Sequence, residues 1–529
     1  MLGDRVAHAS FGRMATIVSL DPATGVPFAE TLGTDPDQIA DAVRKARTAQ
    51  EEWTLRPLGY RRSVIRRFQR LLFDRRQEMA ALITRENGKP LGEALLTDVA
   101  VVLDFARYYV DHAEAILRPR RVRLGNVAFF GKRGRVHWDP MGVIAIISPW
   151  NYPLMLPFGE LIPALLAGNA VVLKPSEFTT RTAVLGTELL HEAGVPPDLC
   201  QLLPGAGDVG AALVQARPDK IFFTGSARTG RKVAVAAAEH LIPVNLELGG
   251  SDPCLILADA DLGRAASGAI WARFTNGGQA CVAAKRVIVE RPVYERFVSE
   301  LATRVAALRL GPGDRAGTDV GPMIRPSQVE ILERQLNESV AQGARVVVGG
   351  RRRPDIGPTF FEPTVVTDVP LDSPVWREEV FGPVMPVVVA DDVEHALRLA
   401  NDSAYGLSAS IWTANRARGE VLARRIEAGA VQVNDATCHV GAVEVPHGGE
   451  KESGLGRSHG ESGLLETCRP RFVASDLFDW MRKPWWFGYH PESAGDRDAF
   501  VRFAFSPSWW DRLRATPGAL RMLRNRRPV

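Results

Sequence analysis

The stretch GVIAIISPWNYPLMLPFGELIPALLAGNAVVLKPSE, residues 142–177, holds two short apolar runs with a longer segment between them. The runs Val143–Ile147 and Ala170–Leu173 have the length of buried strands, and Leu156–Ala167 has the length of a helix. A strand, a helix and a second strand in this order predict a parallel strand pair with a crossover helix. Ligands of such sheets lie beyond the carboxyl ends of the strands, which is where Lys174 stands.

The same alternation continues along the chain. Up to Gly250, strands are expected at Cys200–Leu203, Lys220–Phe223 and Pro243–Leu246, with helices near Thr180–Ala193, Asp208–Gln215 and Arg228–His240. Beyond Gly250, strands are expected near Leu255–Leu257, Val287–Val289, Arg345–Val348, Pro386–Val389 and Ala430–Val433. Residues 35–118 read as helices. The sequence therefore predicts an α/β protein with two parallel sheets.

A lone cysteine, Cys281, follows the Gly277-Gly278 pair that ends the helical pattern Asp261–Phe274. Glycine lets the backbone leave a helix in conformations that other residues avoid. A thiol on such a turn is accessible to a small substrate, as a nucleophile must be. The alternative is that Cys281 is a small buried apolar residue, the usual role of a free cysteine.

Two polar residues end apolar strands. Glu247 follows Ile242–Leu246, and strand interiors disfavour Glu without a specific role, so we interpret it as a general base. Asn151 lies between Pro149 and Pro153, and its amide could donate to an oxyanion. Together with the thiol, they predict covalent catalysis.

These motifs, in this order, resemble the aldehyde dehydrogenase superfamily. The resemblance is also carried by Val172-Leu173-Lys174-Pro175-Ser176-Glu177, Phe223-Thr224-Gly225-Ser226 and Glu378-Glu379-Val380-Phe381-Gly382-Pro383. It extends from about residue 15 to about residue 475. It implies an aldehyde dehydrogenase-like α/β fold with two Rossmann-like domains and a β oligomerisation arm.

By this resemblance, the Cys281 thiolate attacks an aldehyde, and Asn151 holds the oxyanion together with the Cys281 backbone N–H. A hydride then passes to NAD(P), and Glu247 activates the water that hydrolyses the thioester. Relatives that transfer the acyl group to coenzyme A or phosphate generally do not have this base. Its presence favours release of the carboxylic acid.

The resemblance also implies which residues bind the dinucleotide. They are Ile147, Pro149, Trp150, Lys174, Glu177, Gly207, Gly225, Ser226, Glu379 and Phe381. Glu177 favours NAD, because a carboxylate near the adenosine 2′-hydroxyl repels the 2′-phosphate of NADP. NADP stays an alternative, because Arg228 lies nearby in the sequence motif and could accommodate that phosphate.

A second glycine motif, Gly205-Ala206-Gly207-Asp208-Val209-Gly210, fits the dinucleotide pattern G-x-G-x-x-G. The acidic residue that should end the next strand is missing, since Thr224-Gly225-Ser226 stands there. We therefore expect the pyrophosphate near the helix that begins after Ser226, whose N-terminal amides suit an anion.

The substrate channel is expected to be lined by Tyr152, Leu156, Gly159, Trp271 and His439. In the resembled family, some succinate-semialdehyde enzymes carry a carboxylate-binding Arg at the position of Gly159. A glycine there should widen the channel, which favours medium or long aliphatic, or aromatic, aldehydes. The alternative is succinate semialdehyde, because Leu248–Pro253 and Cys281–Arg286 resemble bacterial enzymes of that type. Arg273 and Arg457 would then be the first candidates to bind the substrate carboxylate.

Four parts are expected. They are a dinucleotide-binding domain (1–120 and 141–250), a catalytic domain (251–450), an oligomerisation arm (121–140 and 451–480) and a C-terminal extension (481–529). The arm implies a homodimer or homotetramer, and a surface hairpin on a monomer is the alternative.

The extension is rich in tryptophan and arginine. It holds Trp485, Trp486, Trp509 and Trp510, and ten basic residues against four acidic ones, so the positive charge of the chain gathers there. Such a segment suits peripheral contact with a membrane, a lid over the substrate entrance, or packing between subunits. Pro517-Gly518 is expected to break its only candidate amphipathic helix.

The composition narrows the class of protein. Hydrophobic residues at 46% and charged residues at 24% are typical of a soluble globular protein. The body is close to neutral, so nucleic-acid binding is not expected. The five scattered cysteines predict neither disulfides nor a metal site and, with no signal peptide or transmembrane run, indicate the cytoplasm. An oligomeric or membrane-associated binding protein without turnover is the alternative of another class.

Overall fold

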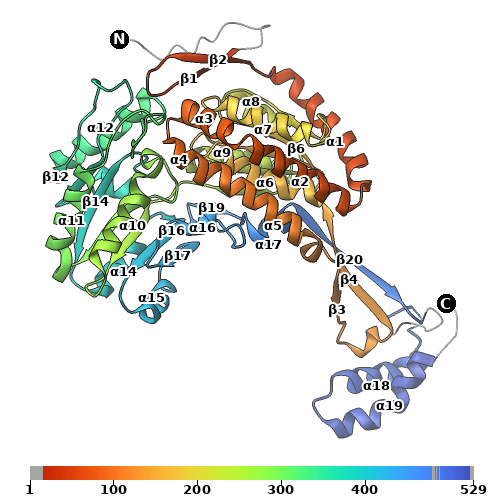
Figure 1. Cartoon of the computed structure of the whole chain (residues 1–529). Coiled ribbons are helices and arrows are strands. Elements are labelled where there is room, and N and C mark those ends of the chain that lie inside the picture. The colour runs from red at the N-terminus through yellow and green to blue at the C-terminus, as the bar shows by residue number, and fades with distance from the viewer. Residues whose placement is uncertain (1–15, 479–482, 484, 488, 525–529) are drawn as a thin grey trace. The chain divides into compact units, whose positions relative to one another are not determined.

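The computed structural model describes residues 16–478, 483, 485–487 and 489–524 (Figure 1). The chain divides into two compact units. The first comprises Met1–Ile116 and Pro140–Cys468, and the second comprises Leu117–Asp139 and Arg469–Val529.

One parallel sheet of the first unit is built around the stretch 142–177. Its strands are β5 (Val143–Ile147), β6 (Ala170–Lys174), β7 (Cys200–Leu202), β8 (Lys220–Thr224), β9 (Val244–Glu247) and β19 (Gly454–Leu455), in the order β19-β9-β8-β5-β6-β7. All neighbours are parallel except β19, which runs antiparallel to β9. The crossovers contain α6 (Met155–Ala167), α7 (Thr180–Glu192), α8 (Gly207–Gln215) and α9 (Ala227–Ala238). Every residue of β5 and β6 is buried, as an unbroken apolar sequence predicts.

N-terminal elements pack around this sheet. They are the hairpin β1 (Thr16–Leu20) and β2 (Pro27–Leu32), the helices α1 (Ile39–Leu55), α2 (Leu58–Asp74), α3 (Arg76–Asn87), α4 (Leu91–Glu93) and α5 (Ala100–Ile116), and a π-helical turn at Ala94–Val99. Helices α2 and α5 lie beside α6 (Figure 1). Buried Glu86 joins β1 to α7, because it accepts hydrogen bonds from the Ser19 hydroxyl and the Arg181 and Thr182 N–H groups.

The second parallel sheet follows residue 250. Its strands are β10 (Asp252–Ile256), β11 (Ala284–Glu290), β12 (Arg345–Val348), β13 (Thr364–Thr367), β14 (Val384–Ala390), β16 (Ser408–Trp412) and β17 (Ala430–Val433), in the order β12-β13-β14-β11-β10-β16-β17. Edge strand β12 is antiparallel to β13, and the other pairs are parallel. The predicted α/β class is therefore confirmed. Strands β13 and β16 were not expected from the sequence, because threonine and serine interrupt their short apolar runs.

Helices and short paired strands complete the first unit. The helices are α10 (Leu262–Phe274), α11 (Tyr294–Ala306), α12 (Pro326–Ala341), α13 (Pro374–Arg377), α14 (Val393–Asn401), α15 (Arg416–Ala423), α16 (Cys438–Gly441) and α17 (Gly460–Glu466). Strands β15 (Tyr405–Gly406) and β18 (Glu450–Lys451) pair with each other.

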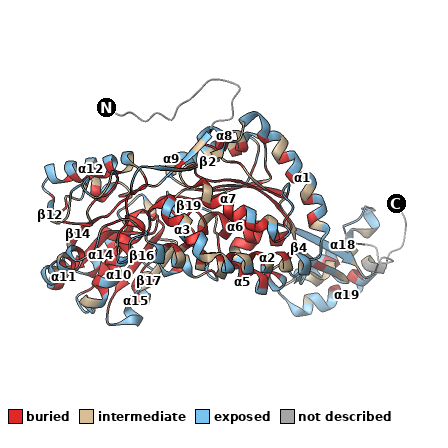
Figure 2. Ribbon diagram, turned by 45° about the horizontal axis from the view of Figure 1, so that its top comes forward, coloured by how far each residue is buried: buried red, intermediate tan, exposed pale blue. Residues whose placement is uncertain are grey.

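The second sheet separates two apolar clusters. Along β11, Ile288 belongs to one cluster, whereas Val287 and Val289 belong to the other, as the alternation of side chains along a strand requires. Figure 2 shows buried residues concentrated along the strands and exposed residues on the outer helices. This packing fixes the loops at the carboxyl ends of the strands.

The second unit contains an antiparallel sheet and a helical hairpin. The sheet has the order β20-β4-β3, from β3 (Arg120–Val122), β4 (Lys132–Pro140) and β20 (Cys468–Asp476). The hairpin pairs α18 (Ala494–Phe505) with α19 (Trp509–Arg524). Helix α19 continues across Pro517, so the expected break there is not found.

The arm also begins later than expected. Residues 451–468 belong to the first unit, because β19 pairs with β9 and α17 packs on α6. The sequence of 451–468 gives no sign of these long-range pairings. Among the described helices, none is long and apolar enough to cross a membrane.

Gly268→Ala is expected to destabilise the fold, because a Cβ there would lie 2.3 Å from the buried Trp412 ring. Overpacking of this kind costs roughly 1–3 kcal/mol. Gly263→Ala on the same helix is the matched control, since its nearest neighbours are 3.4 Å or more away. Thermal unfolding should show a lower Tm for Gly268→Ala and no loss for Gly263→Ala. Equal Tm values for the two variants would contradict this account of the packing.

Candidate active site

The nucleophile loop leaves α10 through a run of left-handed residues. Asn276, Gly277 and Gly278 have φ values of 52°, 61° and 75°. A Cβ at Gly278 would lie 2.4 Å from the carbonyl oxygen of Gly382, so only glycine permits this approach. The loop therefore packs against the Glu-Val-Phe-Gly-Pro turn, and Cys281 stands next to it, partly exposed.

Lys285 joins the nucleophile loop to the same turn. Its Nζ donates to the carbonyl oxygens of Ala280 and Cys281, and it lies 3.3 Å from Glu379 Oε1. This lysine was given no role in the sequence analysis. The signal was present, because a lysine at the start of the apolar strand β11 must find partners when buried.

The Cys281 thiol is neutral in this environment. Burial raises its pKa to about 12, and the nearby Lys285 ammonium opposes the rise. The thiolate is the nucleophilic form, so the thiol must lose its proton when substrate binds.

Asn151 contacts the nucleophile loop directly. Its side-chain amide donates to the Gln279 carbonyl at 3.2 Å, and the Asn276 side chain donates to the Asn151 carbonyl at 2.8 Å. The structure therefore brings the predicted oxyanion donor to the loop that carries Cys281.

The segment 87–98 supports both loops, and sequence reasoning missed it. Lys89, fully buried, pairs with Asp98 at 2.6 Å and donates to the Asn151 carbonyl at 2.9 Å. Glu93 accepts hydrogen bonds from the Thr275 hydroxyl and the Asn276 N–H. A π-helical turn at Ala94–Val99 lies in this segment, and such turns often mark functional sites.

Glu247 ends β9 and is buried. Its Oε1 accepts from the Ser458 hydroxyl at 3.0 Å, whereas Oε2 has no hydrogen-bond partner in the described part of the chain. His447 Nε2 lies 3.8 Å from Oε2. Burial raises the pKa of Glu247 to about 8, against the lowering effects of Ser458 and Arg457. A carboxyl group with this pKa suits proton exchange near neutral pH.

Two aromatic rings and a carboxylate adjoin the nucleophile loop. Trp150 and Phe381 meet edge to face, with ring centroids 5.6 Å apart, and the Lys285 ammonium lies 5.8 Å from the Phe381 ring. Glu379 Oε1 accepts from the Gly250 N–H at 3.1 Å. These residues, which the resemblance predicts to bind the dinucleotide, therefore share the neighbourhood of Cys281.

Other residues that are predicted to bind the dinucleotide lie at or just beyond the ends of neighbouring strands. Lys174 ends β6, and its Nζ lies 3.5 Å from Oε2 of Glu177. Burial lowers the pKa of Lys174, whereas the Glu177 carboxylate opposes this change. Ser226 caps α9 and accepts from the Thr229 N–H. The remaining predicted residues lie at the starts of helices or the ends of strands: Gly207 begins α8, Gly225 follows β8, and Ile147 and Pro149 end or follow β5. Arg228, in the first turn of α9, is exposed.

The predicted channel residues differ in their surroundings. Tyr152 is buried with the Lys89 ammonium 3.9 Å from its ring centroid, Leu156 is half-buried, and Trp271 is 52% exposed. A Cβ at Gly159 would lie 3.0 Å from the ring of Phe105, which is fully buried. Gly159 therefore makes room for α5 to pack on α6, and the expected widening of the channel is not found.

His439, which is predicted to line the substrate channel, is buried. Its Nδ1 lies 3.0 Å from the Gln432 side-chain nitrogen, and its ring stacks on His447 at 5.3 Å. The two arginines considered for a carboxylate are already engaged. Arg273 donates to the carbonyls of residues 380, 382 and 384, and Arg457 to those of 449 and 456.

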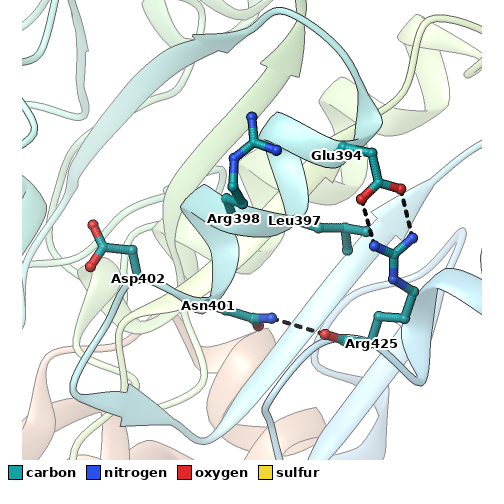
Figure 3. A pocket seen from close by; sticks show the side chains of 6 residues that line it. All are labelled: Glu394, Leu397, Arg398, Asn401, Asp402 and Arg425. Atoms are coloured by element: carbon teal, nitrogen blue, oxygen red, sulfur yellow. Dashed lines mark hydrogen bonds and ion pairs between the residues drawn. The ribbon is translucent and has the colours of Figure 1, made fainter.

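Figure 3 shows a surface hollow beside α14, bridged by the ion pair of Glu394 and Arg425. None of the predicted site residues lines it. The described residues contain no group of three or more His, Cys, Asp or Glu side chains that could hold a metal ion.

The chain is similar to known proteins over most of its length. The model of the aldehyde dehydrogenase family matches residues 10–473. A "Putative succinate-semialdehyde dehydrogenase [NADP(+)]" of Mycolicibacterium smegmatis is 37% identical over 483 residues, 88% of this chain and 92% of that protein. The "4,4'-diapolycopene aldehyde oxidase" of a Methylomonas species is 37% identical over 492 residues, 93% of this chain and 92% of that protein.

A solved structure is also similar. The NAD+ complex of an aldehyde dehydrogenase from Bacillus cereus has a TM-score of 0.84 and 34% identity, covering 87% of this chain and 93% of the other. Because the family match covers most of the chain and these relatives share over a third of their residues with it, the protein belongs to the aldehyde dehydrogenase family and is an NAD(P)-dependent oxidoreductase that acts on aldehydes.

Proposed function

We propose that Cys281 is the nucleophile, Asn151 the oxyanion donor and Glu247 the hydrolytic base in the oxidation of an aldehyde to its carboxylic acid. The contact of Lys285 with both the Cys281 carbonyl and Glu379 gives the strongest support. It joins the nucleophile loop to the Glu-Val-Phe-Gly-Pro turn, whose Glu379 and Phe381 are predicted to bind the dinucleotide. Hydride transfer from a Cys281 adduct requires this proximity.

In the first step the Cys281 thiol releases its proton to solvent, and the sulfur attacks the aldehyde carbon. A C–S bond forms, and the carbonyl oxygen becomes an oxyanion that accepts hydrogen bonds from the Asn151 amide and the Cys281 N–H. The oxyanion then re-forms the carbonyl as the C–H bond breaks, leaving a thioester on Cys281. A bound nicotinamide supplies the acceptor for the hydride.

In the second step Glu247 takes a proton from water, and the water oxygen attacks the thioester carbon. The C–S bond breaks, the acid leaves, and the sulfur recovers a proton. The pKa of about 8 means that Glu247 holds a proton near neutrality and becomes a stronger base once ionised.

The surroundings of the strand ends fit a dinucleotide. Helix α9 presents its N-terminal amides beyond Ser226, as a pyrophosphate requires, and Trp150 and Phe381 flank the side nearest Cys281. We assign Lys174 to the adenosine ribose. Glu177 favours NAD by repelling a 2′-phosphate, although its contact with Lys174 weakens that repulsion.

An aldehyde without a carboxylate is the substrate class we favour. Burial raises the pKa of Tyr152 well above its usual value, and the negative charges of Glu93 and Asp98 add to the rise. The nearby Lys89 is already paired with Asp98. Arg273 is fully buried among backbone carbonyls, and Arg457 is paired with Glu450, so an acid would lose hydration without an accessible, unpaired arginine to replace it. Medium or long aliphatic and aromatic aldehydes carry no carboxylate and therefore suit these surroundings.

Succinate semialdehyde is the second candidate, because a relative with 37% identity carries that name. The non-catalytic alternative loses its support. The Cys281, Glu247 and Asn151 set is intact, and the loops that carry it are held by buried hydrogen bonds.

The arm supports assembly into a homodimer or homotetramer. Strand β20 lies at the edge of its sheet, and most of its residues are exposed. An exposed edge strand carries unpaired backbone groups, which a second chain can complete by adding a strand.

The α18–α19 hairpin supports a peripheral membrane contact. Trp509 and Trp510 stack at 3.8 Å and are both exposed, and Phe505 and Leu513 are exposed beside them in sequence. Residues 494–524 contain six arginines and three aspartates. Exposed tryptophan with a basic excess is typical of helices that lie at an anionic membrane surface.

Cys281→Ala should abolish NADH formation from an aldehyde. Glu247→Gln should give a burst of NADH of about one per active site and little turnover after it, because the thioester forms without being hydrolysed. In the unchanged protein, deacylation should speed up as pH rises towards about 8, since ionisation of Glu247 creates the base. Rapid-mixing absorbance at several pH values measures both effects, and NADH formation by Cys281→Ala would refute the assignment.

A panel of aldehydes tests the substrate and cofactor together. With NAD, kcat/KM should be at least roughly 10-fold higher for aliphatic or aromatic aldehydes than for succinate semialdehyde, since a desolvated, unpaired carboxylate costs more than 1.4 kcal/mol. Glu177→Gln should raise kcat/KM with NADP relative to NAD, and Glu188→Gln on α7 is a control. A preference for succinate semialdehyde would overturn the substrate assignment alone.

Vesicle sedimentation tests the C-terminal hairpin. The full chain should sediment with vesicles of equal parts phosphatidylcholine and phosphatidylglycerol, and less so with phosphatidylcholine alone. Trp509→Ala with Trp510→Ala should reduce sedimentation and leave NADH formation unchanged. No sedimentation of the full chain would exclude a membrane contact of this kind.

A further inference from the structure

Three buried histidines stack in a row beside Glu247. The ring centroids of His439 and His447 are 5.3 Å apart, those of His447 and His459 are 5.0 Å apart, and Phe105 closes the row 4.6 Å from His459. His439 lies on α16, His459 immediately precedes α17, and His447 lies in the loop between these helices. The middle ring, His447, faces Glu247, the last residue of β9, although the two are far apart in sequence.

The backbone holds His447 in place. His447 and Ser458 form a β-bridge, with N–H to carbonyl distances of 2.8 and 2.7 Å in the two directions. The Ser458 hydroxyl donates to Oε1 of Glu247, and His447 Nε2 faces Oε2 at 3.8 Å. At Gly448 a Cβ would lie 3.2 Å from Oε1. The bridge therefore places one polar side chain against each oxygen of the carboxylate.

The three histidines and the neighbouring Glu247 contain buried polar atoms that lack hydrogen-bond partners among the described residues. They are Glu247 Oε2, His439 Nε2, His447 Nδ1 and His459 Nδ1. Buried polar atoms are nearly always hydrogen-bonded in native proteins. Since 3.8 Å is slightly too long for a direct hydrogen bond, a small rotation of the carboxylate would bring Oε2 within reach of His447.

The histidines are neutral. Burial lowers the pKa of His439 to about 3 and that of His447 to about 4, and it lowers the pKa of His459 well below its usual value. The positive charge of Arg457 acts to lower the pKa of both His447 and Glu247. Glu160 and Cys281 are the other titratable groups that interact electrostatically with Glu247. A neutral imidazole can donate one hydrogen bond to a carboxylate without adding charge to the site.

We propose that His447 is a positioning residue for Glu247. Its Nε2–H donates to Oε2 and, together with Ser458, holds the carboxylate in the orientation from which it takes the proton of the hydrolytic water. The His447 ring stacks between the rings of His439 and His459, which fixes its orientation. This inference rests on the proposed role of Glu247 as the base.

The test compares His447→Phe, which removes the donor and keeps an aromatic ring, with His447→Gln, which keeps an amide N–H. His447→Phe should keep the NADH burst, lower the turnover that follows it by roughly 10- to 100-fold, and leave KM for the aldehyde little changed. Its pH profile for deacylation should move to higher pH, because the ionised form of Glu247 loses a donor. His447→Gln should restore much of the turnover and the original profile.

His191→Phe on α7 is the control, because this partly buried histidine forms a hydrogen bond with the Cys200 carbonyl and is not among the predicted site residues. The burst amplitude counts folded active sites, so a misfolded fraction does not obscure the rate per site. Unchanged turnover and pH profile in His447→Phe, with turnover lost in Glu247→Gln, would overturn the positioning role alone. Full turnover in Glu247→Gln would instead overturn the proposed function.

Discussion

The site depends on one buried ammonium group, that of Lys285. Taking a charge out of water is costly unless hydrogen bonds and an opposite charge replace the water. Here the carbonyls of Ala280 and Cys281 and the carboxylate of Glu379 replace it. The same contacts fix the distance between the nucleophile loop and the turn assigned to the cofactor. Removing the lysine would leave Glu379 partly buried beside free carbonyls, so this group links the stability of the loops to their chemistry.

Burial has the same consequence for Cys281 and Glu247, the two groups proposed to react, because it raises the pKa of both. It keeps the Cys281 thiol neutral, which protects it from oxidation while no substrate is bound, since the thiolate is the form that oxidants attack. It also keeps a proton on Glu247 near neutrality. The resting site therefore carries little negative charge at its reacting atoms. Charge develops only when an aldehyde and a dinucleotide complete the site, and Asn151 is already placed against the loop where the oxyanion would form.

The sequence was sufficient to predict the parallel sheet built around residues 142–177 and to propose Cys281, Asn151 and Glu247 as the catalytic set. Unbroken apolar runs such as Val143–Ile147 have one stable solution, burial within a parallel sheet, and a polar residue at the end of such a run is conspicuous. Strand β16 was missed because its SASIW sequence shows neither an apolar run nor a clear alternation. The roles of Lys89 and Glu93 were missed because they depend on contacts with Asn151 and Asn276, far away along the chain.

The same limit explains why Gly159 was misread. A glycine on a helix face indicates a close neighbour but not which one, and here the neighbour is the ring of Phe105 rather than open space. Selectivity must then come from charge. Lys89 pairs with Asp98, Arg457 pairs with Glu450, and Arg273 is fully buried among backbone carbonyls. Glu93 and Asp98 place carboxyl groups near the ring of Tyr152. The proposed preference for aldehydes without a carboxylate rests on these charges and needs no wide channel, because an ion without a counterion cannot recover its hydration energy in such a site.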